Sequence, residues 1–144
     1  MGITFRCGDD EINTGYSHFK FFRDKLAIKV CGEFYDLYVE PERKGAYFML
    51  GNSKQEYFQD HAKRCLALCK RLKVPKKFMY FLWTCDCEGK CTPSQSRFVL
   101  RYAQKFTSEE RNIMFGYATS GKTIQDFLNM FEESVKLNKP ITWS

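Results

Sequence analysis

The chain has 144 residues, which is a typical length for one domain, and its composition of 44% hydrophobic and 28% charged residues excludes an intrinsically disordered protein. No run of about 18 apolar residues occurs, and the first fifteen residues lack the apolar segment of a signal peptide, so we expect no membrane-spanning helix and no secretion leader. The net charge of +6 is a modest excess of positive charge for a chain of this length. From the length and the absence of a leader we expect a cytoplasmic protein with a single domain over residues 1–144.

The N-terminal third predicts a strand, a helix and a β-hairpin. Residues 2–7 alternate apolar and polar side chains, as a short strand does. A helical stretch begins at Ser17, with apolar residues at spacings of three and four, and should end near Cys31-Gly32. The two short apolar runs that follow, separated by Pro-Glu-Arg-Lys-Gly, are consistent with a hairpin at about 34–50.

Ser53 and Glu56 have the spacing of a capping box, which predicts a helix from about residue 53 to Leu72. Its apolar face collects Phe58, His61, Cys65, Leu68, Cys69 and Leu72, and its opposite face carries Lys63, Arg64, Lys70 and Arg71. Pro75 separates this helix from an apolar segment, about 76–84, that is too short to assign as helix or strand.

Three further capping boxes, which begin at Thr92, Thr107 and Thr123, predict three helix starts in the C-terminal half. Pro140 ends the last helix, and the segment after it could pair with the N-terminal strand. Together these patterns predict an α+β fold that is mainly helical: four to five amphipathic helices, a short terminal strand pair and a possible β-hairpin.

Positive charge is concentrated in one part of the chain. No acidic residue occurs from His61 to Cys85, whereas seven lysines and arginines do. A cationic surface attracts acidic partners, either proteins or nucleic acids, although a solvated helix face gives the same pattern. We expect partner-binding residues on this surface, namely Lys63, Arg64, Lys70, Arg71 and Lys73.

The stretch from Gly116 to Thr123 matches the P-loop pattern GxxxxGK[ST], in which Gly116, Gly121, Lys122 and Thr123 would hold a nucleotide. A true P-loop follows a buried strand, however, and the preceding Thr-Ser-Glu-Glu sequence predicts a capped helix. The alternative interpretation is a polar loop that joins two helices.

The loop at 84–95 has the register of an EF-hand loop, with Asp86 and Glu88 at the third and fifth positions and Gly89 at the sixth. Thr84 and Gln95 stand where calcium requires an aspartate and a bidentate glutamate. The same loop contains Cys85, Cys87 and Cys91, which could hold zinc, although their spacing differs from the usual C-x2-C pairs. From the sequence, three alternatives remain open for this loop: it binds calcium, it binds zinc, or it binds no ion.

The seven cysteines are an odd number and no secretion signal precedes them, so we expect free thiols. Nucleophilic catalysis would need a thiol or hydroxyl beside a base, and the two histidines, His18 and His61, lie in no motif that presents them to a cysteine. The sequence therefore favours a protein without catalytic activity, and no catalytic residue is assigned.

The opening MGITF, the segment GYSHFKFFRDKLA, the loop DCEGKCTP and the ending NKPITW resemble a group of small uncharacterised proteins. That group has an MG-[IL]-x-F start, an HSDCDG-x-x-[ST]-P-x-E-C loop and an N-K-P-type C-terminal strand. The resemblance covers about 1–30, 84–104 and 136–143. It implies a shared fold unit and no particular activity, and the chain departs from the group at Thr84, Cys85, Gln95 and Ser96.

From the sequence we expect a binding or regulatory module, such as an inhibitor, whose basic helix face recognises an acidic protein surface more readily than nucleic acid. One alternative is a small nucleotide-binding protein or enzyme that uses the 116–123 stretch. The other is a calcium- or zinc-binding protein that uses the 84–95 loop.

Overall fold

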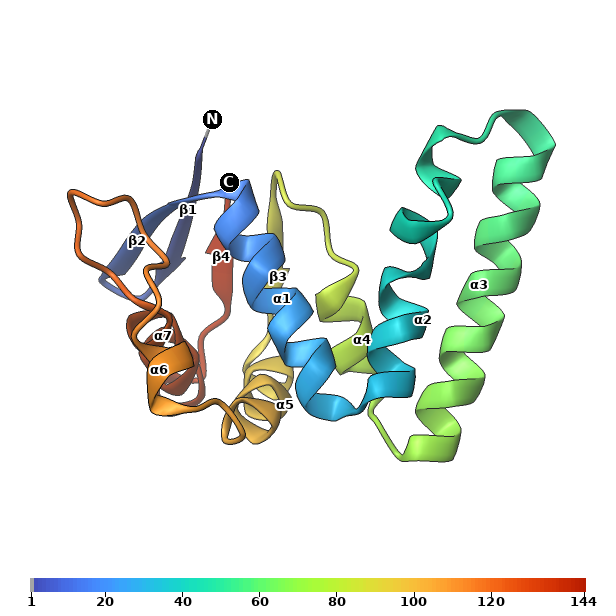
Figure 1. Cartoon of the computed structure of the whole chain (residues 1–144). Helices are drawn as coiled ribbons and strands as arrows, with labels where there is room; N and C mark the ends of the chain where they lie inside the picture. Colours follow the sequence, from blue (N-terminus) through green and yellow to red (C-terminus); the bar gives the residue numbers. More distant parts are fainter. Residues whose placement is uncertain (1) are drawn as a thin grey trace.

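The computed structural model describes residues 2–144, and in this part of the chain four short strands form one antiparallel sheet (Figure 1). The strands are β1 (Gly2–Cys7), β2 (Asp10–Gly15), β3 (Gly89–Cys91) and β4 (Ile141–Trp143), in the order β2-β1-β4-β3. β4 pairs with β1, and the Thr4 amide donates to the Ser144 carbonyl at 2.9 Å. The predicted pairing of the two ends of the chain is therefore confirmed.

Helices make up most of the remaining described residues, so the α+β, mainly helical fold class is confirmed. They are α1 (Tyr16–Val30), α2 (Gly32–Arg43), the 3-10 helix η1 (Ala46–Phe48), α3 (Gly51–Leu72), α4 (Lys76–Leu82), α5 (Pro93–Ala103), α6 (Ser108–Arg111) and α7 (Ile124–Leu137). The sheet and α7 lie at one end of the molecule and α3 at the other, with α1, α4 and α5 between them (Figure 1). None of the helices within residues 2–144 is long and apolar enough to cross a membrane.

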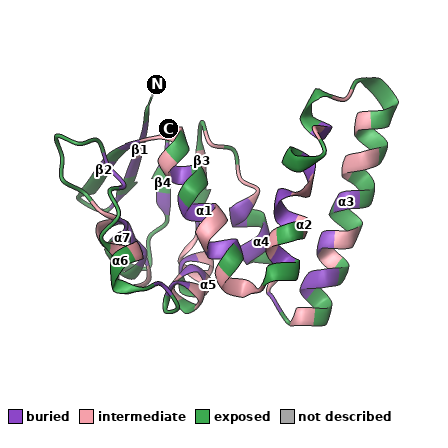
Figure 2. Ribbon diagram, viewed as in Figure 1, coloured by how far each residue is buried: buried purple, intermediate pink, exposed green. Residues whose placement is uncertain are grey.

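A cluster of aromatic side chains joins the sheet to the helices. The Phe127 ring on α7 lies 4.7 Å from the ring of Phe5 on β1 and 4.8 Å from that of Phe22 on α1, measured between centroids. It also stacks on Phe115 at 4.1 Å. These rings are buried, as Figure 2 shows for the inner faces of the elements that carry them. Because a buried aromatic ring removes a large apolar area from water, this cluster stabilises the sheet end of the fold.

The three capping boxes in the C-terminal half are confirmed. The side chains of Thr92, Thr107 and Thr123 each accept a hydrogen bond from the backbone amide three residues later. The side chain of that later residue accepts one in turn from the amide of the capping threonine. These local signals are sufficient to set where the helices begin because each satisfies amides that the helix itself leaves without partners.

Two predictions for the middle of the chain are wrong. Residues 34–50 form α2 and η1 instead of a hairpin. Apolar and polar residues alternate in part of this segment, as in a strand, but the buried positions Phe34, Tyr38 and Pro41 recur at the spacing of a helix. The capping box at Ser53 is absent, because the chain already enters α3 at Gly51, which takes a φ of 60°. The unassigned segment after Pro75 is α4.

Pro41 lies inside α2 and frees a carbonyl group that contacts α3. Proline has no amide hydrogen, so Pro41 leaves the carbonyl of Leu37, four residues earlier, without its helical partner. The Nε2 atom of His61 on α3 lies 2.7 Å from this oxygen and donates to it. His61 is only 4% exposed, so the bond satisfies a polar atom in the interface between the two helices.

A double-mutant cycle tests this interaction. Replacing His61 by leucine removes the donor and should lower the free energy of unfolding by about 1–3 kcal/mol, because the Leu37 carbonyl remains unsatisfied. In a Pro41→Ala background the alanine amide supplies the helical bond, so the same substitution should cost about 1 kcal/mol less. Urea unfolding of the wild type, the two single variants and the double variant measures this coupling. Additive effects of the two substitutions would show that the hydrogen bond from His61 to the Leu37 carbonyl does not stabilise the fold.

Candidate functional site

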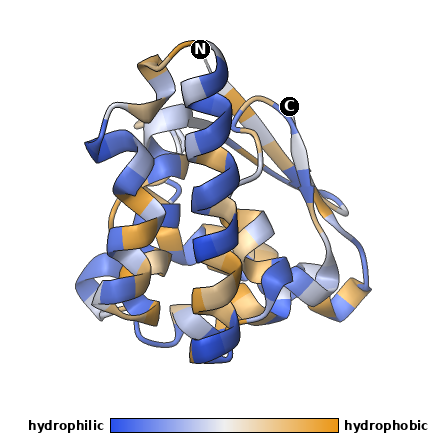
Figure 3. Cartoon of the chain, turned by 90° about the vertical axis from the view of Figure 1, so that its right-hand side faces the viewer, coloured by the Kyte–Doolittle hydropathy of each residue, from blue (hydrophilic) through white to orange (hydrophobic). Residues whose placement is uncertain are grey.

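The predicted basic face lies on α3, the outermost helix of the fold, and Figure 3 views the molecule from this side. Lys63, Lys70 and Lys73 are exposed and take part in no ion pair within residues 2–144. Arg64 and Arg71 instead pair with the α2 carboxylates of Glu40 and Glu33. The five predicted residues therefore share one helix and its C-cap, but only the lysines present a charge without an intramolecular partner.

Arg64 is held by a network that belongs to the α2–α3 interface. Its guanidinium donates to both carboxylate oxygens of Glu40, at 2.9 and 2.6 Å, and to Asp60 at 2.8 Å. The Tyr57 hydroxyl donates to Glu40 at 2.6 Å. The hydrogen bonds from Arg64 hold the pKa of Glu40 at about 2 against the opposing effect of burial. Arg64 is therefore a structural residue, and reversing its charge would disturb packing as well as any partner.

A groove lies at the C-terminal end of α3. Its floor is apolar, and three lysines stand at its rim; we call this set the α3 groove, lined by Leu66, Ala67, Cys69, Val74 and Pro75 with Lys70, Lys73 and Lys76. The volume is about 540 Å³. The three rim lysines are exposed and make no ion pair in the described part of the chain. The groove thus combines apolar surface with uncompensated positive charge.

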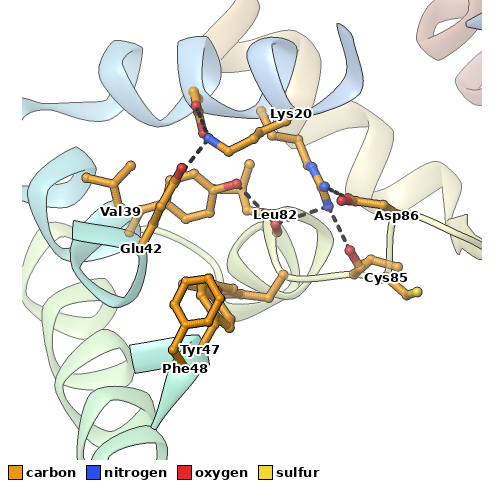
Figure 4. A pocket seen from close by; sticks show the side chains of 13 residues that line it. Lys20, Val39, Glu42, Tyr47, Phe48, Leu82, Cys85 and Asp86 are labelled. Carbon is orange, nitrogen blue, oxygen red and sulfur yellow. Dashed lines mark hydrogen bonds and ion pairs between the residues drawn. The ribbon is translucent and has the colours of Figure 1, made fainter. Parts of the chain in front are cut away.

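A second hollow of about 540 Å³ lies where α1, the α2–η1 segment and residues 82–86 meet (Figure 4). Its charged side chains pair among themselves. Lys20 bonds to Asp24 at 2.8 Å and to Glu42 at 3.0 Å. Arg23 pairs with Asp86. Because each cation in this cleft already faces a carboxylate, the cleft offers less free charge than the α3 groove.

Arg23 is the most deeply buried cation of the cleft, with 5% of its surface exposed. Its guanidinium lies 4.0 Å from the centre of the Phe19 ring and donates to the carbonyls of Leu82 and Thr84, at 3.3 and 2.7 Å. Burial lowers the pKa of Arg23 from its ordinary value. Sequence reasoning missed this residue, although its spacing from Phe19, Phe22 and Leu26 already places it on the apolar face of α1.

The P-loop match at 116–123 lies in a loop between α6 and α7, and no parallel strand leads into it within residues 2–144. The amides of Phe115 and Gly116 both donate to the Lys122 carbonyl, at 2.9 and 3.0 Å, so the loop closes on itself. The Thr123 hydroxyl caps α7. The Gly116 amide and the Thr123 hydroxyl are thus used within the fold, while Gly121 and Lys122 are exposed.

The 84–95 loop joins α4 to α5, as in a helix–loop–helix unit, but its candidate ligands do not gather at one point. Asp86 pairs with Arg23, and Glu88, Cys85 and Cys87 are at least partly exposed. Cys91 is fully buried beneath α5, with its sulfur 3.5 Å from the Ser96 hydroxyl. Within residues 2–144, no three histidine, cysteine or acidic side chains gather as a metal site would require. The predicted calcium and zinc ligands do not form one ligand set here.

A cysteine does lie beside a histidine, which the sequence did not indicate. The Cys65 sulfur is 3.6 Å from Nε2 of His61, one helical turn away on α3. Both residues are buried, and burial raises the pKa of Cys65 to about 12. A nucleophilic thiol needs a lowered pKa and access to substrate, so this pair serves packing. His18 instead lies 3.3 Å from the Thr14 hydroxyl, measured at Nδ1.

Comparison with known proteins gives no relative: no family model, no curated protein and no solved structure matches the chain. The resemblance to the group of small proteins described above stays a prediction.

The Glu40–Arg64 contact predicts a specific pH dependence. The pKa of Glu40 is lowered in the folded protein, so its stabilising effect is present above the ordinary value of 4.5 and disappears as the pH falls toward 2. Replacing Glu40 by glutamine should therefore reduce the free energy of unfolding by roughly 1–2 kcal/mol at pH 7, an amount limited by solvent screening, and by almost nothing near pH 2.

Denaturant unfolding at several pH values measures this difference. The matched control is Glu56→Gln, an exposed α3 carboxylate outside the ion pairs of residues 2–144, which should stay within about 0.5 kcal/mol of wild type. A constant difference between Glu40→Gln and wild type across this pH range would contradict the assignment.

Proposed function

We propose that this protein is a non-catalytic binding or regulatory module that recognises an acidic, partly apolar protein segment at the α3 groove. The observation that carries the proposal is the presence of three lysines without intramolecular partners around an apolar floor. An acidic amphipathic segment matches both features, because its carboxylates face the rim lysines while its apolar side chains cover the floor.

The structure changes which residues the proposal relies on. Arg64 and Arg71 stabilise the α2–α3 packing through Glu40 and Glu33, so they position α3 and contribute less to partner capture. Lys70 and Lys73 remain in the proposed surface, and Lys76, at the start of α4, joins them. Lys63 lies further along the outer face of α3 and adds to the attraction at longer range.

A protein partner is favoured over nucleic acid by the floor of the groove. Binding to a phosphate backbone depends on cations and needs no apolar floor, whereas Leu66, Ala67 and Pro75 offer surface that only an apolar side chain would cover well. The cysteines are all free thiols, which fits action in a reducing compartment such as the cytoplasm.

Charge reversal at the rim tests the proposal. The probe is a fluorescent amphipathic peptide of glutamate, aspartate and leucine, and binding is followed by fluorescence anisotropy. The triple variant Lys70→Glu/Lys73→Glu/Lys76→Glu should weaken binding by roughly tenfold or more, which corresponds to about 1.4 kcal/mol. Binding to the wild type should also weaken as the salt concentration rises.

The control variant, Lys90→Glu/Lys122→Glu/Lys136→Glu, changes the net charge equally at exposed lysines elsewhere and should bind like wild type. Circular dichroism checks that both variants fold. Equal losses in the two variants, undiminished binding of a peptide with glutamine in place of its acidic residues, or tighter binding of a single-stranded oligonucleotide would each refute a specific acidic protein site at the groove.

A further inference from the structure

Cys85 and Cys87 differ from the other cysteines of the chain in their surroundings. Both are exposed on the loop between α4 and β3, two residues apart, whereas the other five are buried or half-buried. Buried thiols behave as small apolar side chains. This pair is therefore accessible to reagents and substrates in solution, and it lies apart from the residues that line the α3 groove.

The backbone that carries Cys85 is firmly anchored even though its thiol is exposed. Arg23 donates to the Thr84 carbonyl at 2.7 Å, and the indole nitrogen of Trp143 donates to the Cys85 carbonyl at 3.0 Å. The Thr84 hydroxyl bonds back to Tyr80 at 2.8 Å. These bonds come from three separate elements, so the backbone at Cys85 is held in place by the fold.

Gly89 closes the other end of the loop. A Cβ atom there would lie 2.5 Å from the Trp143 ring and 2.7 Å from Thr84, which only glycine avoids. The two ends of the 84–89 segment therefore meet at Trp143, and the residues between them form a tight turn. This turn directs backbone amides toward the Cys85 sulfur.

The Cys87 amide donates to the Cys85 sulfur at 3.3 Å. Donation by the backbone amides of Cys87 and Glu88, together with the Cys87 thiol, lowers the pKa of Cys85 from its ordinary value. The same thiol contact raises the pKa of Cys87, because its proton is shared with Cys85. By contrast, burial raises the pKa of Cys91 to about 12. The directions of these pKa shifts favour Cys85 as the attacking thiolate and Cys87 as the thiol that keeps its proton.

The carboxylate between the two cysteines does not oppose a thiolate at Cys85. Asp86 forms an ion pair with Arg23 inside the cleft. Figure 4 shows the Asp86 carboxylate turned toward that ion pair, while the Cys85 sulfur points away from it. The negative charge nearest in sequence is thus neutralised by a buried cation. The Glu88 charge does oppose a thiolate at Cys85, but the hydrogen bonds to the sulfur outweigh it and the pKa of Cys85 remains lowered.

We propose that Cys85 and Cys87 form a thiol–disulfide exchange pair whose substrates are accessible disulfides. The Cys85 thiolate attacks one sulfur of the substrate disulfide, which breaks the S–S bond and releases the other half as a thiolate that takes up a proton. Cys87 then loses its proton and attacks the Cys85 sulfur, which releases the second half of the substrate. The substrate is reduced to two thiols, and the protein is oxidised to a Cys85–Cys87 disulfide.

Oxidised glutathione is a suitable probe for the reduced 144-residue chain, with mass spectrometry to identify the products. The wild type should lose two hydrogens at a disulfide between Cys85 and Cys87. Cys87→Ser keeps a side-chain donor beside Cys85 and should stop at a mixed disulfide of Cys85 with glutathione. Cys85→Ser should react at least about tenfold more slowly, because the amide donation that lowers the pKa of Cys85 has no counterpart at the remaining Cys87 thiol.

Cys31→Ser serves as the control because it removes a half-buried thiol elsewhere, and it should behave like wild type. Alkylation of Cys87→Ser by iodoacetamide across a pH series provides a second readout and should show a midpoint below the ordinary thiol pKa. Equal reactivity of Cys85→Ser and Cys87→Ser, or failure of the wild type to form the internal disulfide, would overturn the proposal.

Discussion

The placement of α3 depends on a carbonyl group of α2 that has no hydrogen-bond donor within α2. Pro41 deprives the Leu37 oxygen of a partner in α2, and His61 supplies one from α3. Because an unsatisfied buried oxygen costs about 1–3 kcal/mol, this bond favours one register of α3 against α2. The Glu40–Arg64 pair and the Tyr57 hydroxyl lie in the same interface and favour that register too. The outward face of α3 follows from it.

The two ends of the molecule are therefore stabilised in different ways. Aromatic rings around Phe127 hold the sheet against α1 and α7. At the opposite end, hydrogen bonds and ion pairs add to the packing of the buried α3 side chains Cys65, Leu68 and Cys69. The polar interface uses the two arginines of α3 and leaves Lys63 and Lys70 in water. Because the arginines are engaged in ion pairs and the lysines are not, the outer surface of α3 has unpaired positive charge beside an apolar groove. This surface is the basis of the proposed binding role.

The sequence was informative where structure is set locally and uninformative where it is set by distant residues. The capping boxes at Thr92, Thr107 and Thr123 involve residues three apart, so each helix start could be predicted. Residues 34–43 alternate in a way that suits a strand, and only burial against the core shows the helical period. The second strand of the N-terminal hairpin was also missed, although Gly8 and Asp9 stand at its turn.

The same distinction applies to the candidate site. Positive charge along α3 is visible in the sequence, but Glu40 lies 24 residues before Arg64, and only the fold brings them together. The Cys85–Cys87 spacing was visible as well, yet the anchoring of this pair by Arg23 and Trp143 depends on residues about 60 positions away. Ion pairs between residues far apart in the sequence engage two arginines of the predicted basic surface. Hydrogen bonds over similar distances hold the backbone next to the thiol pair.

Amide chemical-shift mapping tests the central claim, that the α3 groove binds an acidic segment. Isotope-labelled protein is titrated with the acidic amphipathic peptide, and shift changes are recorded for every assigned backbone amide. The largest changes should fall on residues 66–76, with smaller ones along the outer face of α3. Largest changes in the 116–123 loop or around Arg23, with the groove unaffected, would contradict it.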